Sequence, residues 1–301
     1  MWLYYGLILL SVSMFGCGFA IQNQYRKMRG SGLQISMESS YIGALSGLIV
    51  LLVFNRFSLD FTPFTLLMAI LAALNGMTFT FCAFKALDYI NLSLFSLFAM
   101  LGGMALPFFQ GIVFYKEELT LAKVVCVLFI CAALLCTVKG GDKKRGTIFY
   151  VGIFLLNGMS GVISKLFTAS NLPKTSTLEY SMWIAIATVV LSGGARITLS
   201  VLEKRRTSKG EYGVSPPSRK TRIRSYALGA SNGVINRLAN LLLVFALIFV
   251  DSSVQYPMVT GGTMIVSTVL SCFGEKKPTK KEIVSVGLAF VGMCALFFIP
   301  I

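Results

Sequence analysis

The chain has 301 residues, of which 55% are apolar and 13% are charged, and its mean hydropathy is +0.77. Soluble domains carry about a quarter of charged residues, so this composition excludes a soluble domain as the main fold. The formal charge of +15 does not indicate nucleic-acid binding, because the cations lie in short connectors between apolar runs. Histidine, the usual general base near neutral pH, is absent from the sequence. We therefore expect a membrane protein that is not an enzyme and binds no cofactor.

Ten apolar runs follow one another along the chain, each close to the roughly 20 residues that a helix needs to cross a bilayer. Glycine, proline and charged residues separate these runs. The sequence therefore predicts an all-α integral membrane protein with ten transmembrane helices, and the tightest breaks lie at Asp88 to Asn91 and at Asp251. The predicted spans cover residues 2–22, 34–54, 63–87, 91–114, 121–139, 147–169, 177–201, 225–249, 252–273 and 281–300.

The two halves of the chain resemble each other span by span. We take residues 1–140 and 146–301 as two five-helix repeats, and a polar loop at 203–224 absorbs their difference in length. Because five is odd, the second repeat enters the membrane from the opposite side, which predicts an inverted-topology repeat. The matching positions include Tyr4/Tyr150, Glu38/Glu179, Asn75/Asn232, Gly102/Gly261 and Thr120/Thr279.

Short motifs recur in order through both halves. They are Ala86-Leu87-Asp88-Tyr89, Glu117-Glu118-Leu119-Thr120, and Gly274-Glu275-Lys276-Lys277-Pro278-Thr279 followed by Gly287 and Gly292. With these motifs the chain resembles the drug/metabolite transporter (DMT) superfamily, in particular its ten-span EamA-type branch. Two departures are Lys116, where that connector carries glycine, and a fifth span without glycine. The resemblance implies a secondary transporter of a small metabolite, often an exporter.

Polar residues inside a membrane are costly unless they face a partner or a wet cavity, and the eighth span is the richest in them. Asn232, Asn236 and Asn240 stand at i, i+4 and i+8, and Arg237 lies beside them near mid-span. We expect this face to line a substrate cavity. The alternative interpretation is that the asparagines form hydrogen bonds between helices for packing.

The third span carries a second polar face, which includes Asn75 and Lys85. The repeat predicts that this face lies opposite the eighth span, so that Arg237 and Lys85 together hold a carboxylate or another anion. An anionic or zwitterionic solute, such as an amino acid or an organic anion, is therefore the expected substrate. The alternative for Lys85 is that it snorkels to the membrane surface.

Three more polar residues are candidate substrate contacts. Lys165 lies inside the sixth span, with snorkelling as its alternative role. Gln255 and Tyr256 open the ninth span just before Pro257, and a proline frees a backbone carbonyl that can face a substrate.

Glu38 and Glu179 are candidate proton-coupling groups. They occupy equivalent early positions in spans two and seven, and burial raises the pKa of a carboxyl group towards physiological pH. The alternative is a structural role, because an acid in a first helical turn favours the helix dipole and Ser176-x-x-Glu179 fits a capping box.

The distribution of cations predicts the orientation. Odd-numbered connectors carry nineteen Lys and Arg residues and even-numbered connectors carry four, so the positive-inside rule places the odd connectors in the cytoplasm. We expect a multi-pass protein of the plasma (inner) membrane whose partners are lipid, a small solute and possible coupling protons. A non-transporting scaffold or sensor is the alternative function. An intramembrane serine protease is excluded because no histidine can activate Ser160.

Overall fold

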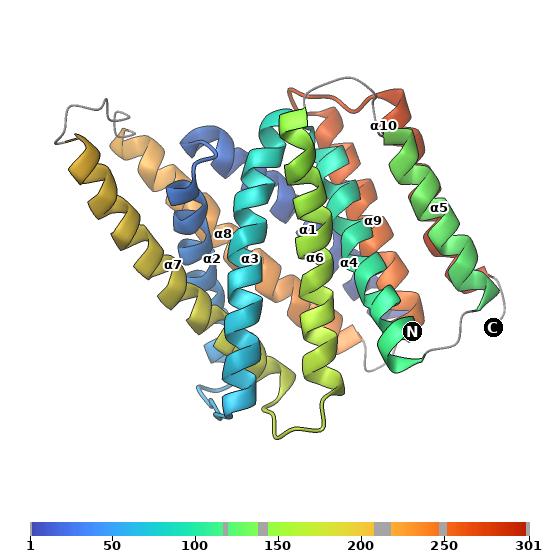
Figure 1. Ribbon diagram of the computed structural model, residues 1–301, viewed down its shortest axis with the longest axis horizontal. Helices are drawn as coiled ribbons and strands as arrows, with labels where there is room; N and C mark the ends of the chain where they lie inside the picture. Colours follow the sequence, from blue (N-terminus) through green and yellow to red (C-terminus); the bar gives the residue numbers. More distant parts are fainter. Residues whose placement is uncertain (1, 117–119, 138–143, 208–217, 247–251, 299–301) are drawn as a thin grey trace.

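The structure, a computed structural model, describes residues 2–116, 120–137, 144–207, 218–246 and 252–298, and in these residues the regular elements are ten α-helices (Figure 1). Each predicted span corresponds to one helix. The break between the third and fourth spans is confirmed, whereas Asp251 lies outside the described residues. The helices are α1 (Trp2–Arg29), α2 (Leu33–Phe54), α3 (Pro63–Tyr89), α4 (Leu92–Tyr115), α5 (Leu121–Thr137), α6 (Lys144–Ala169), α7 (Thr177–Thr207), α8 (Arg219–Ala246), α9 (Ser252–Cys272) and α10 (Lys280–Phe298).

Several helices are longer than the apolar runs that predicted them. α1 continues through its cations to Arg29, α7 continues to Thr207, and α8 begins at Arg219, so part of the predicted loop 203–224 is helical. Hydropathy marks the stretch that suits a bilayer core and not the helix itself. Lys and Arg are good helix formers, which explains why helices extend into these cationic segments.

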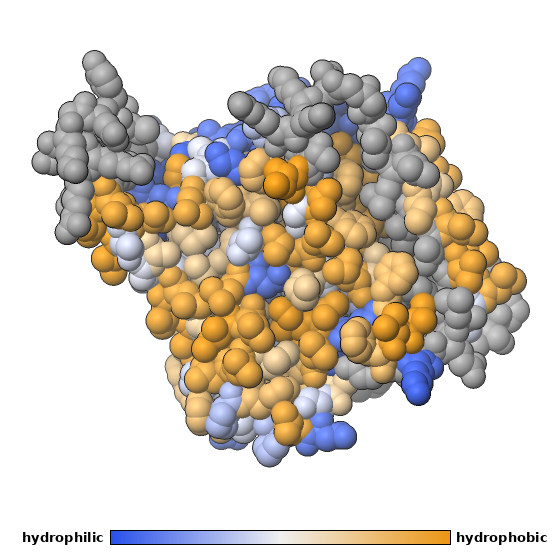
Figure 2. All heavy atoms as spheres, viewed as in Figure 1, coloured by the Kyte–Doolittle hydropathy of each residue, from blue (hydrophilic) through white to orange (hydrophobic). Residues whose placement is uncertain are grey.

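Six helices are long and apolar enough to cross a membrane, namely α1, α2, α3, α4, α6 and α7. The apolar stretches of α5 and α9 are shorter, and α8 is interrupted by its asparagines and Arg237. Ten helices are therefore observed in the described residues, and six of them meet the criteria for a span. Figure 2 shows apolar residues over the middle of one face, with hydrophilic residues gathered towards its upper and lower margins. This surface fits a multi-pass membrane protein.

Helix contacts made in one half of the chain have equivalents in the other half. The equivalent helices are α1 and α6, α2 and α7, α3 and α8, α4 and α9, and α5 and α10. α1 packs against α8 and α9, just as α6 packs against α3 and α4. α2 contacts α7 and α8, and α7 contacts α2 and α3. α5 and α10 lie together at one edge of the bundle (Figure 1). The contacts therefore follow the same two-fold pattern as the sequence repeat.

Small residues bring the main helix pairs close together. A Cβ atom on Gly102 of α4 would lie 2.0 Å from the carbonyl oxygen of Phe154 on α6. A Cβ atom on Gly233 of α8 would lie 2.2 Å from the carbonyl oxygen of Gly43 on α2. Because lipid offers no hydrophobic drive for helix association, such close backbone contact is a main source of packing energy in a membrane. Gly102 therefore allows the close contact between α4 and α6.

Gly102→Ala should destabilise the protein by about 1–3 kcal/mol, because the added methyl group must push α4 and α6 apart. The measurement is the apparent melting temperature in detergent. Gly6→Ala is the matched control, since a Cβ atom there meets nothing within 4 Å. Equal melting temperatures for the two variants would contradict this account of the α4–α6 contact.

Candidate functional site

A cavity of about 520 Å³ lies between two groups of three helices. One wall comes from α1, α2 and α8, and the other from α3, α6 and α7. The helices of one wall are the predicted repeat counterparts of the helices of the other wall. We call this space the central cavity, and its volume is within the range of about 300–1,000 Å³ usual for small-molecule sites.

The α8 wall carries the polar residues that the sequence singled out. Asn232, Asn236, Arg237 and Asn240 all line the central cavity. Asn236 Nδ2 donates hydrogen bonds to the backbone oxygen and to Oδ1 of Asn232, both at 2.9 Å, and Asn240 Nδ2 donates to the backbone oxygen of Asn236 at 2.8 Å. The asparagines thus bond along their own helix, and this arrangement keeps their side chains on the cavity wall.

Arg237 is the one charged residue among the described residues that line the central cavity. Its stem lies against α2 at Gly47, where a Cβ atom would approach Arg237 Cγ to 2.8 Å. Within the described part of the chain, its guanidinium forms no ion pair. A positive charge without a carboxylate partner attracts an anion.

The opposite wall presents hydroxyl groups, which the sequence analysis did not single out. Five of these hydroxyls donate their proton to the carbonyl oxygen four residues earlier in their own helix, at 2.7–3.0 Å. Their oxygen lone pairs remain available as acceptors. The signal was present as Ser and Thr at helical spacing, but such residues also occur where helices merely pack. The residues of this kind that line the cavity are Thr80, Ser164, Thr168, Ser181 and Thr188.

Two buried hydroxyls at the cavity have no hydrogen-bond partner within the described residues. They are the hydroxyl of Tyr180, a residue that is 4% exposed, and Oγ of Ser40. The Tyr180 ring is fixed by stacking on Phe167, with ring centroids 3.9 Å apart. Buried polar groups without partners cost free energy, and those beside a cavity can be satisfied by a bound solute.

The structure does not bring Asn75 and Lys85 to the central cavity. Asn75 Nδ2 donates to the carbonyl oxygen of Leu156 on α6 at 2.9 Å, and Cys82, on the same face of α3, lies against Gly152 of α6. This face packs between helices, and the cavity face of α3 is instead Ala72, Gly76, Phe79 and Thr80. The expected pairing of Lys85 with Arg237 on one anion is therefore not observed.

Lys165 lines a second cavity of about 680 Å³, which lies on the other side of α6 between α4 and α9. The two cavities share Ser160, Ser164 and Thr168 as part of their walls. Gln255 and Tyr256 belong to the first turns of α9, and their side chains lie outside the described part of the structure.

A buried ionic cluster lies beside the central cavity, at the end of the bundle where the odd connectors lie. Arg29 Nη2 donates to both carboxylate oxygens of Glu38, at 2.7 and 3.0 Å, and the Tyr25 hydroxyl donates to Oε1 at 3.0 Å. Arg196 Nη2 lies 3.6 Å from Oε2. The cluster joins α1, α2 and α7, and the next residue of α2, Ser39, already lines the cavity.

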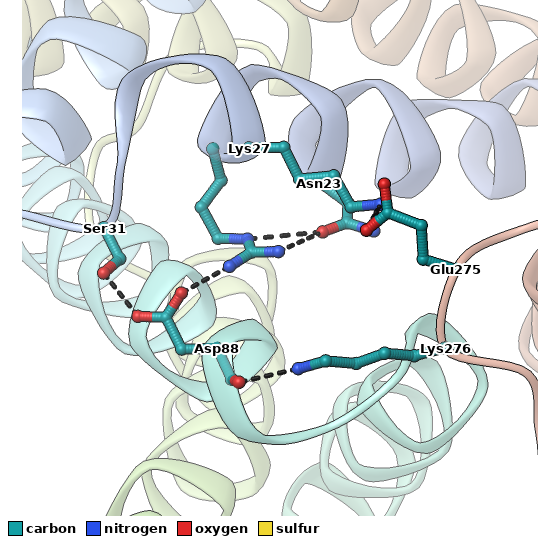
Figure 3. Close-up of polar contacts among 7 residues, drawn as sticks. Asn23, Lys27, Ser31, Asp88, Glu275 and Lys276 are labelled. Carbon is teal, nitrogen blue, oxygen red and sulfur yellow. Dashed lines mark hydrogen bonds and ion pairs between the residues drawn. The ribbon is translucent and has the colours of Figure 1, made fainter.

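A second polar cluster lies at the same end of the bundle (Figure 3). The Asp88 carboxylate accepts from Arg26 and from Ser31, and its backbone oxygen accepts from Lys276 Nζ at 2.6 Å. Lys27 and Glu275 form an ion pair of 2.9 Å, and the hydrogen bond from Lys27 lowers the pKa of the Glu275 carboxyl group below its usual value. These contacts link α1 and α3 to the connector between α9 and α10.

The other end of the cavity has no equivalent cluster among the described residues. The cavity lining continues there to Thr168 and Thr177, near the ends of α6 and α7. Glu179 forms the capping box with Ser176, whose N–H donates to Glu179 Oε2 at 2.9 Å, and it also accepts from the backbone N–H of Asp60 at 3.1 Å. Glu38 and Glu179 thus hold equivalent positions and have different partners.

Comparison with known proteins gives the fold alone. No protein-family model and no curated protein matches the chain. One similar crystal structure has a TM-score of 0.54 and 16% sequence identity, and the match covers 96% of this chain and 99% of the other. The helical architecture is therefore shared over nearly the whole length of both chains.

Glu38→Ala should lower the unfolding free energy by about 3–5 kcal/mol, because it leaves Arg29 buried without its counter-ion. The measurement is the apparent melting temperature in detergent. Glu275→Ala removes an ion-pair partner that is 81% exposed, so that variant should melt at the same temperature as the unchanged chain. An equal effect of the two variants would contradict the role of Glu38 as the centre of a buried cluster.

Proposed function

We propose that this chain is a secondary transporter of the EamA-type branch of the DMT superfamily, with ten spans arranged as two inverted five-helix repeats. Three observations support this assignment. They are the sequence similarity of the two halves, the equivalent helix contacts of the two halves, and the connector motifs. It moves a small metabolite across the plasma membrane by alternating access, in which one repeat rocks against the other around a fixed site.

The observation that carries the proposal is the central cavity itself. It lies at the middle of the helices, between walls that are counterparts in the repeat, where transporters with inverted repeats bind their substrates. It is bounded at one end by the Glu38 cluster and reaches towards the other end. A cavity closed at one end at a time is what alternating access requires.

The solute is an anionic or zwitterionic metabolite held by Arg237, with Asn232, Asn236 and Asn240 beside it. Lys165, Gln255 and Tyr256 remain candidate contacts on the second cavity and on α9. Glu38 and Glu179 remain candidate coupling groups, although both carboxylates are engaged in the described conformation. The positive-inside rule supports a cytoplasmic position of the odd connectors, and export is the direction that the family resemblance favours.

Arg237→Gln should reduce solute counterflow in proteoliposomes at least tenfold, because it removes the charge that faces the cavity. The assay screens amino acids, organic acids and amines, with and without a proton gradient, so that the same series also tests proton coupling. Arg222→Gln is the matched control, since Arg222 is an exposed cation of the same helix outside the cavity. If no solute of any class crosses, the transport function is contradicted and the scaffold or sensor alternative is favoured.

A further inference from the structure

The charge of the central cavity restricts the charge of its ligand. Arg237 contributes one positive charge, and the described lining contains no carboxylate. A ligand with a single net negative charge makes the occupied cavity neutral. A zwitterion pairs its carboxylate with the guanidinium but leaves its ammonium group without an anionic partner in the described lining, and an uncompensated charge away from water is costly.

The wall formed by α3, α6 and α7 restricts the rest of the ligand. Five of its hydroxyl groups donate their protons to backbone carbonyl oxygens, which cannot themselves donate, so these five act towards a ligand as acceptors. The Tyr180 hydroxyl on the same wall has no partner among the described residues and can also donate. The wall therefore offers mainly acceptors. A ligand complements it with donors of its own, and hydroxyl groups supply donors without adding charge.

The two walls differ at positions that the repeat matches. Arg237 and Thr80 occupy equivalent positions, since each follows its asparagine, Asn232 or Asn75, by five residues, and both line the cavity. On α8 this position carries the cation, and on α3 it carries a hydroxyl acceptor. The cavity consequently has an anion-binding side on α8 and a hydroxyl-binding side on α3, α6 and α7.

We propose that the central cavity binds a hydroxylated monoanion of the sugar-acid type, with its carboxylate on Arg237 and its hydroxyl groups on the acceptor wall. This inference rests on the proposed function for the site, and it narrows the substrate class. The unpartnered hydroxyls of Tyr180 and Ser40 supply two further hydrogen-bonding groups at the same cavity.

The test is calorimetric binding of four probes to the purified full chain in detergent. Gluconate is the hydroxylated monoanion, hexanoate the apolar monoanion, sorbitol the hydroxylated neutral solute, and glucosaminate the hydroxylated zwitterion. Gluconate should bind at least tenfold more tightly than each of the others, because it alone combines a carboxylate for Arg237 with hydroxyl donors and adds no uncompensated charge. Equal or tighter binding of hexanoate, sorbitol or glucosaminate would overturn the inference.

Variants of each wall assign the binding to the two walls. Arg237→Gln should weaken gluconate binding about ten- to hundredfold, and Arg237→Lys, which keeps the charge, should retain part of the affinity. The double variant Thr80→Val with Thr188→Val should weaken gluconate binding about three- to tenfold and leave hexanoate binding unchanged. Thr198→Val is the control, since Thr198 makes the same intrahelical hydrogen bond outside the cavity.

The melting temperature of each variant separates loss of binding from loss of folding. A folded Thr80→Val, Thr188→Val protein that binds gluconate as tightly as the unchanged chain would contradict the acceptor wall. Gluconate that binds as expected but does not cross proteoliposomes would contradict transport and leave this inference standing. Flux of another solute class without gluconate binding would overturn the inference and leave transport standing.

Discussion

The interaction on which the candidate site depends is the placement of one guanidinium in a cavity between two groups of three helices. Arg237 is placed there by the close contact of α8 with α2, which glycines at 43, 47 and 233 allow. The same contact brings the asparagines of α8 to the cavity wall. A larger residue at Gly47 would clash with the side-chain stem of Arg237. The close packing of α2 and α8 therefore also determines the position of the positive charge.

The two ends of the molecule differ in the partners of two carboxylates that the sequence comparison matches. Glu38 and Glu179 are counterparts, yet Glu38 joins three helices through Arg29, Tyr25 and Arg196, whereas Glu179 caps its own helix and accepts from Asp60. The first arrangement holds helices together at the end of the odd connectors. The second leaves the cavity lining continuous to the ends of α6 and α7.

The sequence was sufficient to locate ten helices because apolar runs and polar breaks alternate clearly along the chain. It located the α8 side of the cavity for a similar reason, since three asparagines and an arginine inside an apolar run require a polar surrounding. It did not predict the orientation of α3, because the faces of Asn75 and of Thr80 are both plausible from spacing. Which one faces the cavity depends on the α3–α6 contact, made by Asn75 with Leu156 and by Cys82 with Gly152.

Thiol accessibility tests most directly the claim that this cavity is a pathway open to one side at a time. In a chain whose seven cysteines are replaced, Ser181→Cys and Ser39→Cys each place one thiol on the cavity wall. An impermeant thiol reagent should label Ser181→Cys from the side of the even connectors, and should reach Ser39→Cys from the opposite side only while a transported solute is present. Labelling of Ser39→Cys from both sides without solute, or of Ser181→Cys from neither side, would contradict the account.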